Sequence, residues 1–273
     1  MNRIWVIIFG VLGASRVEAQ VFHDPVKSAY ITGGAYSEQF TDAFSFTGNP
    51  AVLGTARSGR LALSAERRWM LKELDYCQLA GAFPAGSGGI GFQFHYTGDA
   101  DYNESSLAMA YGKNLGNISL GLQFRYEMYH TAGYGNKPDG SVTLGLRFHP
   151  VEKLYAGLVF SSSVFERKEQ ANPEKGSGDY IMGFGYEASA LVLISIQFIK
   201  EAGIPLNLIG CIDYRWSDQF FASLGMETNS ASPYIKAGWK KNQLTVEWFT
   251  AYHAALGFTP GLVLLWESKK RPG

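Results

Sequence analysis

The sequence has little cysteine, no excess of charge and no long apolar run beyond its first residues. Its 273 residues include 24 Lys and Arg, 24 Asp and Glu, and two Cys. This balance lacks the basic excess of nucleic-acid-binding chains, so no nucleic-acid partner is expected. Cys77 and Cys211 fall in predicted strands far apart in the order, which favours two small buried packing residues over a disulfide.

Membrane-spanning helices are also missing from the pattern. The closest candidate, residues 190–199, is interrupted by Ser195 and Gln197 and is too short to cross a bilayer. Glycine and aromatic residues are plentiful instead, with 32 Gly and 14% aromatic side chains. A membrane protein of this composition must span by strands, because only helices and closed barrels satisfy the backbone in lipid.

The N-terminus resembles a cleavable export signal. Arg3 gives a positive start, residues 4–14 are apolar, and Val17-Glu18-Ala19 ends in small residues at the two positions that a signal peptidase reads. A membrane anchor helix would need a longer run, and this one is broken by Arg16. Residues 1–19 are therefore predicted to be removed, and the absence of Cys at the cleavage point argues against a lipoprotein.

From Gly59 onward, stretches of roughly ten residues alternate apolar with polar or small side chains. In residues 117–130, one face carries Ile118, Leu120, Leu122, Phe124, Tyr126 and Met128, and the other Ser119, Gly121, Gln123, Arg125 and Glu127. A helix would scatter the two sets around its circumference. We expect the apolar face to contact lipid and the polar face to line a lumen.

A soluble β-sandwich also alternates, but two features favour a barrel. Aromatic residues gather at strand ends, as Trp69, Trp216 and Trp239 do, where interfacial girdles form. Short connections such as 150–153 also alternate with longer ones such as 97–103, 131–140 and 166–178.

The pattern therefore predicts an all-β fold, a closed antiparallel transmembrane β-barrel of about 14 strands, within the range 12–16. Its expected divisions are a signal peptide at 1–19, a periplasmic or plug segment at 20–58, the barrel at 59–267 and a tail at 268–273. The strand expected at 73–83 alternates poorly. Pro260 and Gly261 predict a bulge or kink in the last strand.

Several segments resemble the FadL-like superfamily, including the PorV and PorQ barrels of type IX secretion. Residues 42–51 carry the leading motif Asp42, Asn49, Pro50 and Ala51. Residues 102–116 are similar to a strand and turn of these barrels, as are residues 253–261 to their closing segment. The resemblance implies a 14-strand barrel, with roles in secretion or in passage of hydrophobic molecules.

No reactive constellation stands out from the sequence. Residues 99–104 begin like a calcium loop, but Glu104 stands at the sixth position, where an EF-hand needs Gly. The five His show no zinc-site spacing. We expect no metal, no cofactor and no catalytic residue, and therefore no enzyme.

Charged residues on the polar face are the most informative candidates. Their mixed signs predict pairing across the lumen, either as a salt-bridged filling or as an ion-selective constriction. By the alternation these residues are Glu66, Arg125, Glu127, Arg147, Glu187, Asp213, Arg215, Glu227, Lys236, Lys240 and Glu247.

Two functions from different classes follow. The main hypothesis is an outer-membrane structural component that contacts lipid and docks secretion or surface-assembly proteins, as the PorV and PorQ resemblance implies. The alternative is a FadL-like channel for hydrophobic small molecules. It draws on the predicted kink at Pro260 and on the glycine-rich stretches 86–91 and 183–185, where missing side chains could open space.

Overall fold

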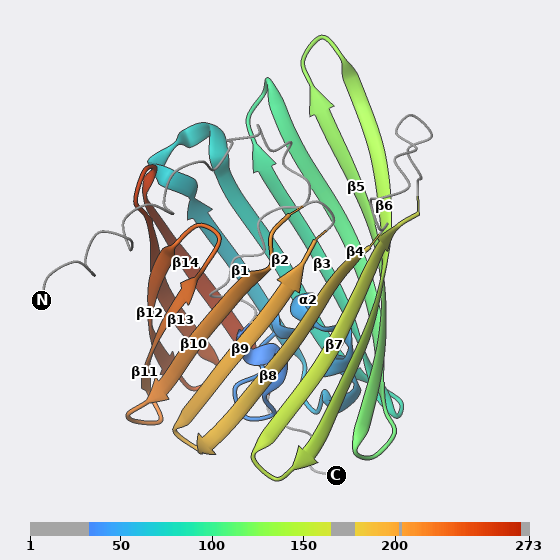
Figure 1. The fold of residues 1–273 in the computed structure, drawn as a ribbon, viewed down its shortest axis with the longest axis vertical. Helices are drawn as coiled ribbons and strands as arrows, with labels where there is room; N and C mark the ends of the chain where they lie inside the picture. The colour runs from blue at the N-terminus through green and yellow to red at the C-terminus, as the bar shows by residue number, and fades with distance from the viewer. Residues whose placement is uncertain (1–32, 165–177, 202–203, 269–273) are drawn as a thin grey trace, which may run out of the picture.

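The computed structural model describes residues 33–164, 178–201 and 204–268, which form a closed barrel of antiparallel strands (Figure 1). Each strand pairs with its neighbours along the chain, and the first pairs with the last. The fourteen strands are β1 (Arg60–Arg67), β2 (Asp75–Ala85), β3 (Gly88–Gly98), β4 (Tyr102–Asn114), β5 (Ile118–Thr131), β6 (Gly135–Val151), β7 (Leu154–Ser163), β8 (Asp179–Ser189), β9 (Val192–Lys200), β10 (Asn207–Arg215), β11 (Phe220–Glu227), β12 (Ser232–Lys241), β13 (Leu244–His253) and β14 (Gly257–Glu267).

The predicted fold class and strand number are confirmed, and the faces of the strands explain why. On β5, Ile118, Leu120 and Phe124 are exposed on the outside, whereas Ser119 and Gln123 are buried within. The outer surface of the barrel is therefore apolar and the inner surface polar. No helix among the described residues is long and apolar enough to cross a membrane.

The two ends of the barrel differ in their connections. Tight turns follow every even-numbered strand up to β12. The start of β1 and the end of β14 lie on the same side of the barrel as these turns, and we call this side the turn end (Figure 1). The opposite end, the loop end, carries η3 (Arg68–Met70) and η4 (Lys72–Leu74) between β1 and β2.

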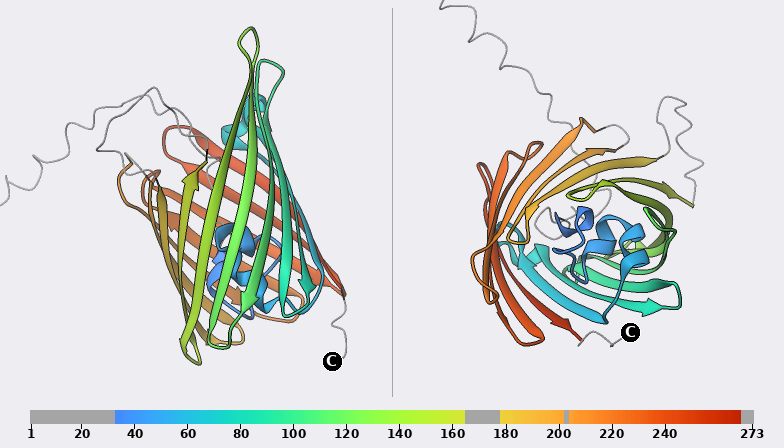
Figure 2. Two further views of the ribbon diagram at one scale, coloured as in Figure 1. Left: turned by 90° about the vertical axis from the view of Figure 1, so that its right-hand side faces the viewer. Right: turned by 90° about the horizontal axis from the view of Figure 1, so that it is seen from below.

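One predicted loop is wrong. Residues 131–140 were expected to connect two strands, but β5 continues to Thr131 and β6 begins at Gly135. Gly133 and Gly135 adopt positive φ values of 80° and 83°, which permit the tight turn between them. The result is a long hairpin that rises above the loop end (Figure 2, left). Most of the predicted 166–178 loop lies outside the described residues.

Two doubtful strands are regular. β2 begins at Asp75, after η4, and buries Tyr76, Gln78 and Ala80 on alternate positions. Of the predicted bulge or kink in β14, the bulge is absent, since Pro260 pairs with Thr250 of β13 without a shift of register. β14 pairs with β1 only from Gly261 to Glu267, so Pro260 lies one residue outside the stretch that pairs with β1.

The cysteine prediction is half wrong. Both thiols are free, but only Cys211 is buried, and Cys77 is exposed on the outer face of β2. The predicted signal peptide lies outside the described residues, as do residues 20–32.

The assignment of the apolar face to lipid can be tested by placing a charge on it. Leu224, in the middle of β11, is 60% exposed on that face. Leu224→Arg should weaken folding into lipid vesicles by about 2 to 4 kcal/mol if this position lies near the bilayer centre. Urea unfolding in vesicles measures this, with Tyr134→Arg at the hairpin tip as control; equal effects of the two would contradict the assigned faces.

Candidate functional site: the plugged lumen

Residues 33–58 fold inside the barrel near the turn end and form what we call the plug (Figure 2, right). The plug contains η1 (Gly33–Tyr36), α2 (Ser45–Gly48) and η2 (Pro50–Thr55). These elements are too short to be stable alone, so wall contacts and local hydrogen bonds must hold them.

The residues of the leading motif shape the plug. The Asp42 carboxylate accepts bonds from the Phe44 and Ser45 amides at 2.8 Å each, which fixes the start of α2. Asn49 accepts a bond from the Ala51 amide and donates one to Leu146 O on β6, both at 3.0 Å. Asn49 therefore starts η2, with Pro50 after it, and ties that helix to the wall.

A row of glycines on four adjacent strands forms the seat of η2. Gly89, Gly112, Gly121 and Gly145 face one another in register from β3 to β6. A Cβ on any of them would lie closer than 3.0 Å to atoms of the plug. This glycine row leaves the wall bare so that the plug backbone can approach it closely.

A second glycine patch, on β7 and β8, receives Tyr36. A Cβ on Gly183 or Gly185 would collide with the ring or backbone of this tyrosine, and one on Gly157 would lie 3.0 Å from its ring. Tyr36 is fully buried, and its hydroxyl has no hydrogen-bond partner in the described parts of the chain. Burial raises the pKa of this hydroxyl above its usual range. The expectation of open space at 183–185 and at Gly89 and Gly91 is thus wrong, because plug atoms fill it.

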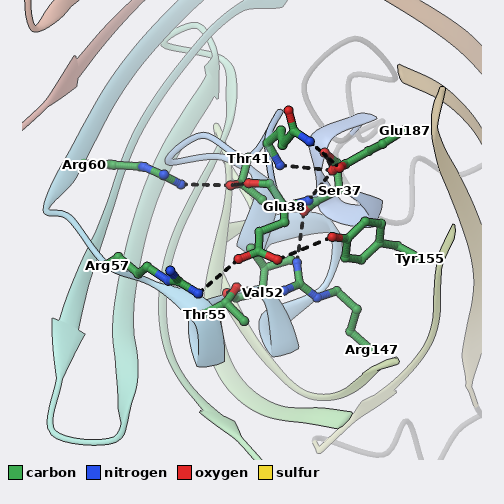
Figure 3. A network of polar contacts seen from close by, with 11 residues as sticks. Ser37, Glu38, Thr41, Val52, Thr55, Arg57, Arg60, Arg147, Tyr155 and Glu187 are labelled. Atoms are coloured by element: carbon green, nitrogen blue, oxygen red, sulfur yellow. Dashed lines mark hydrogen bonds and ion pairs between the residues drawn. The ribbon is translucent and has the colours of Figure 1, made fainter. Parts of the chain in front are cut away.

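Glu187 of β8 is the most heavily bonded anchor of the plug (Figure 3). One carboxylate oxygen accepts from Ser37 Oγ at 2.6 Å and from the Glu38 and Gln39 amides at 2.7 and 3.0 Å. The other accepts from Gln39 Nε2 at 3.0 Å. A buried carboxylate with four donors is well satisfied, so it fixes the 37–39 turn.

Arg147 of β6 joins the two ends of the plug. Its guanidinium donates to Ser37 O at 3.1 Å and to Thr55 Oγ1 at 2.7 Å (Figure 3). It also lies 5.8 Å from the ring centroid of Tyr155, whose hydroxyl donates to Glu38 at 3.4 Å. Removing Arg147 would therefore release η1 and η2 together.

Two further arginines hold the middle of the plug. Arg215 of β10 donates to Gln39 O at 2.9 Å and lies 3.9 Å over the Phe40 ring. Arg60 of β1 donates to Thr41 Oγ1 at 3.1 Å and pairs with Glu267 at 3.0 Å. The plug is thus anchored from β1, β6, β8 and β10.

The other predicted lumen charges mostly have partners on the wall. Lys236 pairs with Glu247 at 3.6 Å, Arg125 with Glu127 at 3.6 Å, and Glu66 with Arg68 at 2.7 Å. Glu227 accepts a bond from Asn207 at 2.6 Å, Asp213 accepts one from Ser223, and Lys240 is exposed beside the lumen cavity. These partners lie close by on the wall and not on the opposite side of the lumen. Arg147, Glu187 and Arg215 bind the plug instead.

The wall opposite the glycine row is built differently. Gly225, Gly238 and Gly261 face aromatic partners on the next strand, and the rings of Tyr234, Phe221 and Phe249 occupy the space over them. No part of the plug is needed to cover these glycines. A cavity of about 970 Å³ remains between this wall and the plug, reaching from Cys211 and Tyr234 to the turns at the turn end.

No metal site is present in the described part of the chain, where no three His, Cys, Asp or Glu side chains gather suitably. In the suspected calcium loop, Asp99 accepts bonds from the Tyr102 and Asp101 amides, and these lower the pKa of its carboxyl. Its carboxylate therefore serves the turn. On the inner wall, Ser106 Oγ and His95 Nδ1 lie 2.6 Å apart, a contact that the sequence pattern did not predict.

Comparison with known proteins bears on the fold class alone. No protein-family profile and no curated protein matches the sequence. Among solved structures, the toluene transporter TbuX of Ralstonia pickettii superposes with a TM-score of 0.59 at 8% identity, covering 89% of this chain and 97% of its own. The toluene transporter TodX of Pseudomonas putida gives 0.58 at 7% identity, covering 88% and 96%.

A FadL homologue of Pseudomonas aeruginosa gives a TM-score of 0.55 at 9% identity and covers 87% of this chain and 95% of its own. At such identities the likeness shows the fold alone, which is that of FadL-like outer-membrane barrels. It agrees with the FadL-like part of the sequence resemblance and gives the PorV and PorQ part no support.

The glycine row predicts a steric test. A Cβ on Gly121 would lie within 3.0 Å of the Pro50 and Ala51 backbone, so Gly121→Ala must displace η2 and should cost about 1 to 3 kcal/mol. Gly210→Ala on β10 is the control, because no atom lies within 4 Å of its added Cβ. Thermal unfolding in detergent should separate the two variants, and equal midpoints would argue against a tightly seated plug.

The contribution of the Glu187 carboxylate to holding the plug can be tested by removing its charge. Glu187→Gln removes the charge that four donors share and leaves an amide facing them, which should weaken the plug contact by about 1 to 3 kcal/mol. Chymotrypsin should then cut faster at Phe40 and Phe44, which are partly or fully buried in the native plug. Glu152→Gln, in an exposed turn, should leave cleavage unchanged.

Proposed function

We propose that this protein is an outer-membrane channel that passes small organic molecules through its lumen, beside the plug. The observation that carries this proposal is the cavity of about 970 Å³ between the plug and the wall of β10–β14. It is large enough for a single-ring molecule, since typical small-ligand sites have volumes of about 300 to 1,000 Å³. Export by the predicted signal of residues 1–19 would deliver the chain to that membrane.

The neighbours support a transport role. TbuX and TodX are described as toluene transporters, and CymD, with a TM-score of 0.54 and 10% identity, as a monoaromatic hydrocarbon channel. We therefore take neutral single-ring compounds as the first substrate class. Phe40, Phe221 and Tyr234 give the cavity an aromatic lining that suits them.

The route we propose runs along the lumen. Pairing between described strands is continuous around the ring, with register shifts only beside Val151 and Ser189, close to tight turns. A continuous wall favours exit at the turn end, where the cavity is lined by residues of several turns, over exit sideways into lipid.

A docking role in type IX secretion would need a surface for partner proteins. The contacts of Arg147, Glu187 and Arg215 hold the chain's own plug, and none of the neighbours named above is described as a secretion component. The channel therefore accounts for more of the structure than the docking hypothesis does.

Filling the cavity should block passage. Thr245 of β13 lines the cavity, whereas Thr250 lies on the outer face of the same strand. In cells that lack their own hydrocarbon channels, this protein should raise uptake of radiolabelled benzyl alcohol. Thr245→Trp should lower the gain severalfold, and Thr250→Trp should preserve it. No gain with the unaltered protein would refute the channel.

A further inference from the structure

The cavity beside the plug is richer in carboxylates than in cations. Eight carboxylate and four cationic side chains line it. Arg57 of the plug and Arg147 of β6 bond plug residues but do not line the cavity, and even when both are added the carboxylates outnumber the cations by two. A cleft of one dominant sign, enclosed by low-dielectric walls, concentrates ions of the opposite sign.

The inner part of the cavity holds three carboxylates around one ammonium group. Lys236 pairs with Glu247 at 3.6 Å, while Asp42 and Asp213 line the same space. Neutral donors hold the last two, since Asp42 accepts from Phe44 and Ser45, and Asp213 accepts from Ser223 and Cys211. Three carboxylates against one ammonium group leave a formal excess of negative charge in this part of the cavity.

The mouth of the cavity is acidic as well. Glu152 and Asp218 are exposed in the turns that precede β7 and β11. Of the cations there, Arg60 pairs with Glu267, Arg215 is engaged with Gln39 and Phe40 of the plug, and Lys240 is exposed. At the turn end an approaching solute thus meets two exposed carboxylates against one exposed ammonium group.

Aromatic rings add a second attraction for cations. Phe221 and Tyr234 lie over Gly238 and Gly225, and both rings line the cavity. The π-systems of such rings attract organic cations within about 6 Å, and their apolar surface accepts a hydrocarbon body. Carboxylates beside aromatic rings suit a protonated amine better than a carboxylate ion.

We propose that the cavity selects small organic cations, such as protonated aromatic amines, over anions of the same size. This inference rests on the proposed channel function and names the charge preference of that same cavity. Neutral molecules remain substrates, and their passage tests the channel apart from its charge preference.

The experiment compares three single-ring probes in cells that make the full-length protein. Radiolabelled benzylamine, benzoate and benzyl alcohol carry positive, negative and no charge at neutral pH, and uptake by cells with an empty vector is subtracted. We expect benzylamine to enter about tenfold faster than benzoate, the low end of the range for electrostatic focusing.

A double variant localises the effect. Glu152→Lys with Asp218→Lys changes the lining to six carboxylates and six cations, so the amine preference should fall toward equality. The matched control is Glu73→Lys with Asp101→Lys, the same charge change at two exposed positions of the loop end that do not line the cavity. This control should keep the preference.

The outcomes are distinct. Entry of benzyl alcohol with benzoate at least as fast as benzylamine would overturn the charge preference and leave the channel standing. A preference that survives the double variant, or that the control also loses, would overturn its assignment to this cavity. Uptake of none of the three probes would overturn the channel itself.

Discussion

Closure of the sheet is the constraint on which the rest of this structure depends. Seven residues of β1, from Arg60 to Glu66, pair in register with β14, so no strand in the described ring lacks a partner on either side. An apolar exterior such as this one can face hydrocarbon only if the backbone is paired throughout. Closure also creates an interior, and the inner face of every strand must then be matched to whatever occupies that space.

Glycine on the inner wall is used in two ways that divide the lumen. From β3 to β8 the bare wall receives the plug, whose backbone and Tyr36 ring occupy the room that side chains would take. From β11 to β14 the rings of Phe221, Tyr234 and Phe249 cover the glycines of the inner wall from the neighbouring strand. The first half is therefore filled, while the second keeps an open volume lined by charged residues. The anchors Arg147, Glu187 and Arg215 secure this asymmetry.

The sequence predicted the barrel well because alternation with a period of two is a local signal, visible in stretches such as 117–130. It predicted the plug poorly. The contacts of Glu187 with Ser37 and of Arg147 with Thr55 join residues 150 and 92 positions apart, and no periodicity reports such pairs. The prediction of open space at Gly183 and Gly185 fails because a lone sequence shows a missing side chain but not the neighbour that fills the gap. The prediction of a loop at 131–140 fails because turn residues mark a hairpin tip without revealing how far the strands extend.

The position of the seam relative to the plug has a consequence for assembly. The seam joins β1 to β14, whereas the glycine row and the Tyr36 site lie on β3 to β8, away from it. An open, curved sheet can therefore wrap around the plug while its two edges are still apart, and zipping of the edges can follow. A finished ring would instead have to admit folded α2 and η2 through a mouth crowded by its own turns. The location of the seam is thus compatible with encapsulation of the plug before the ring closes.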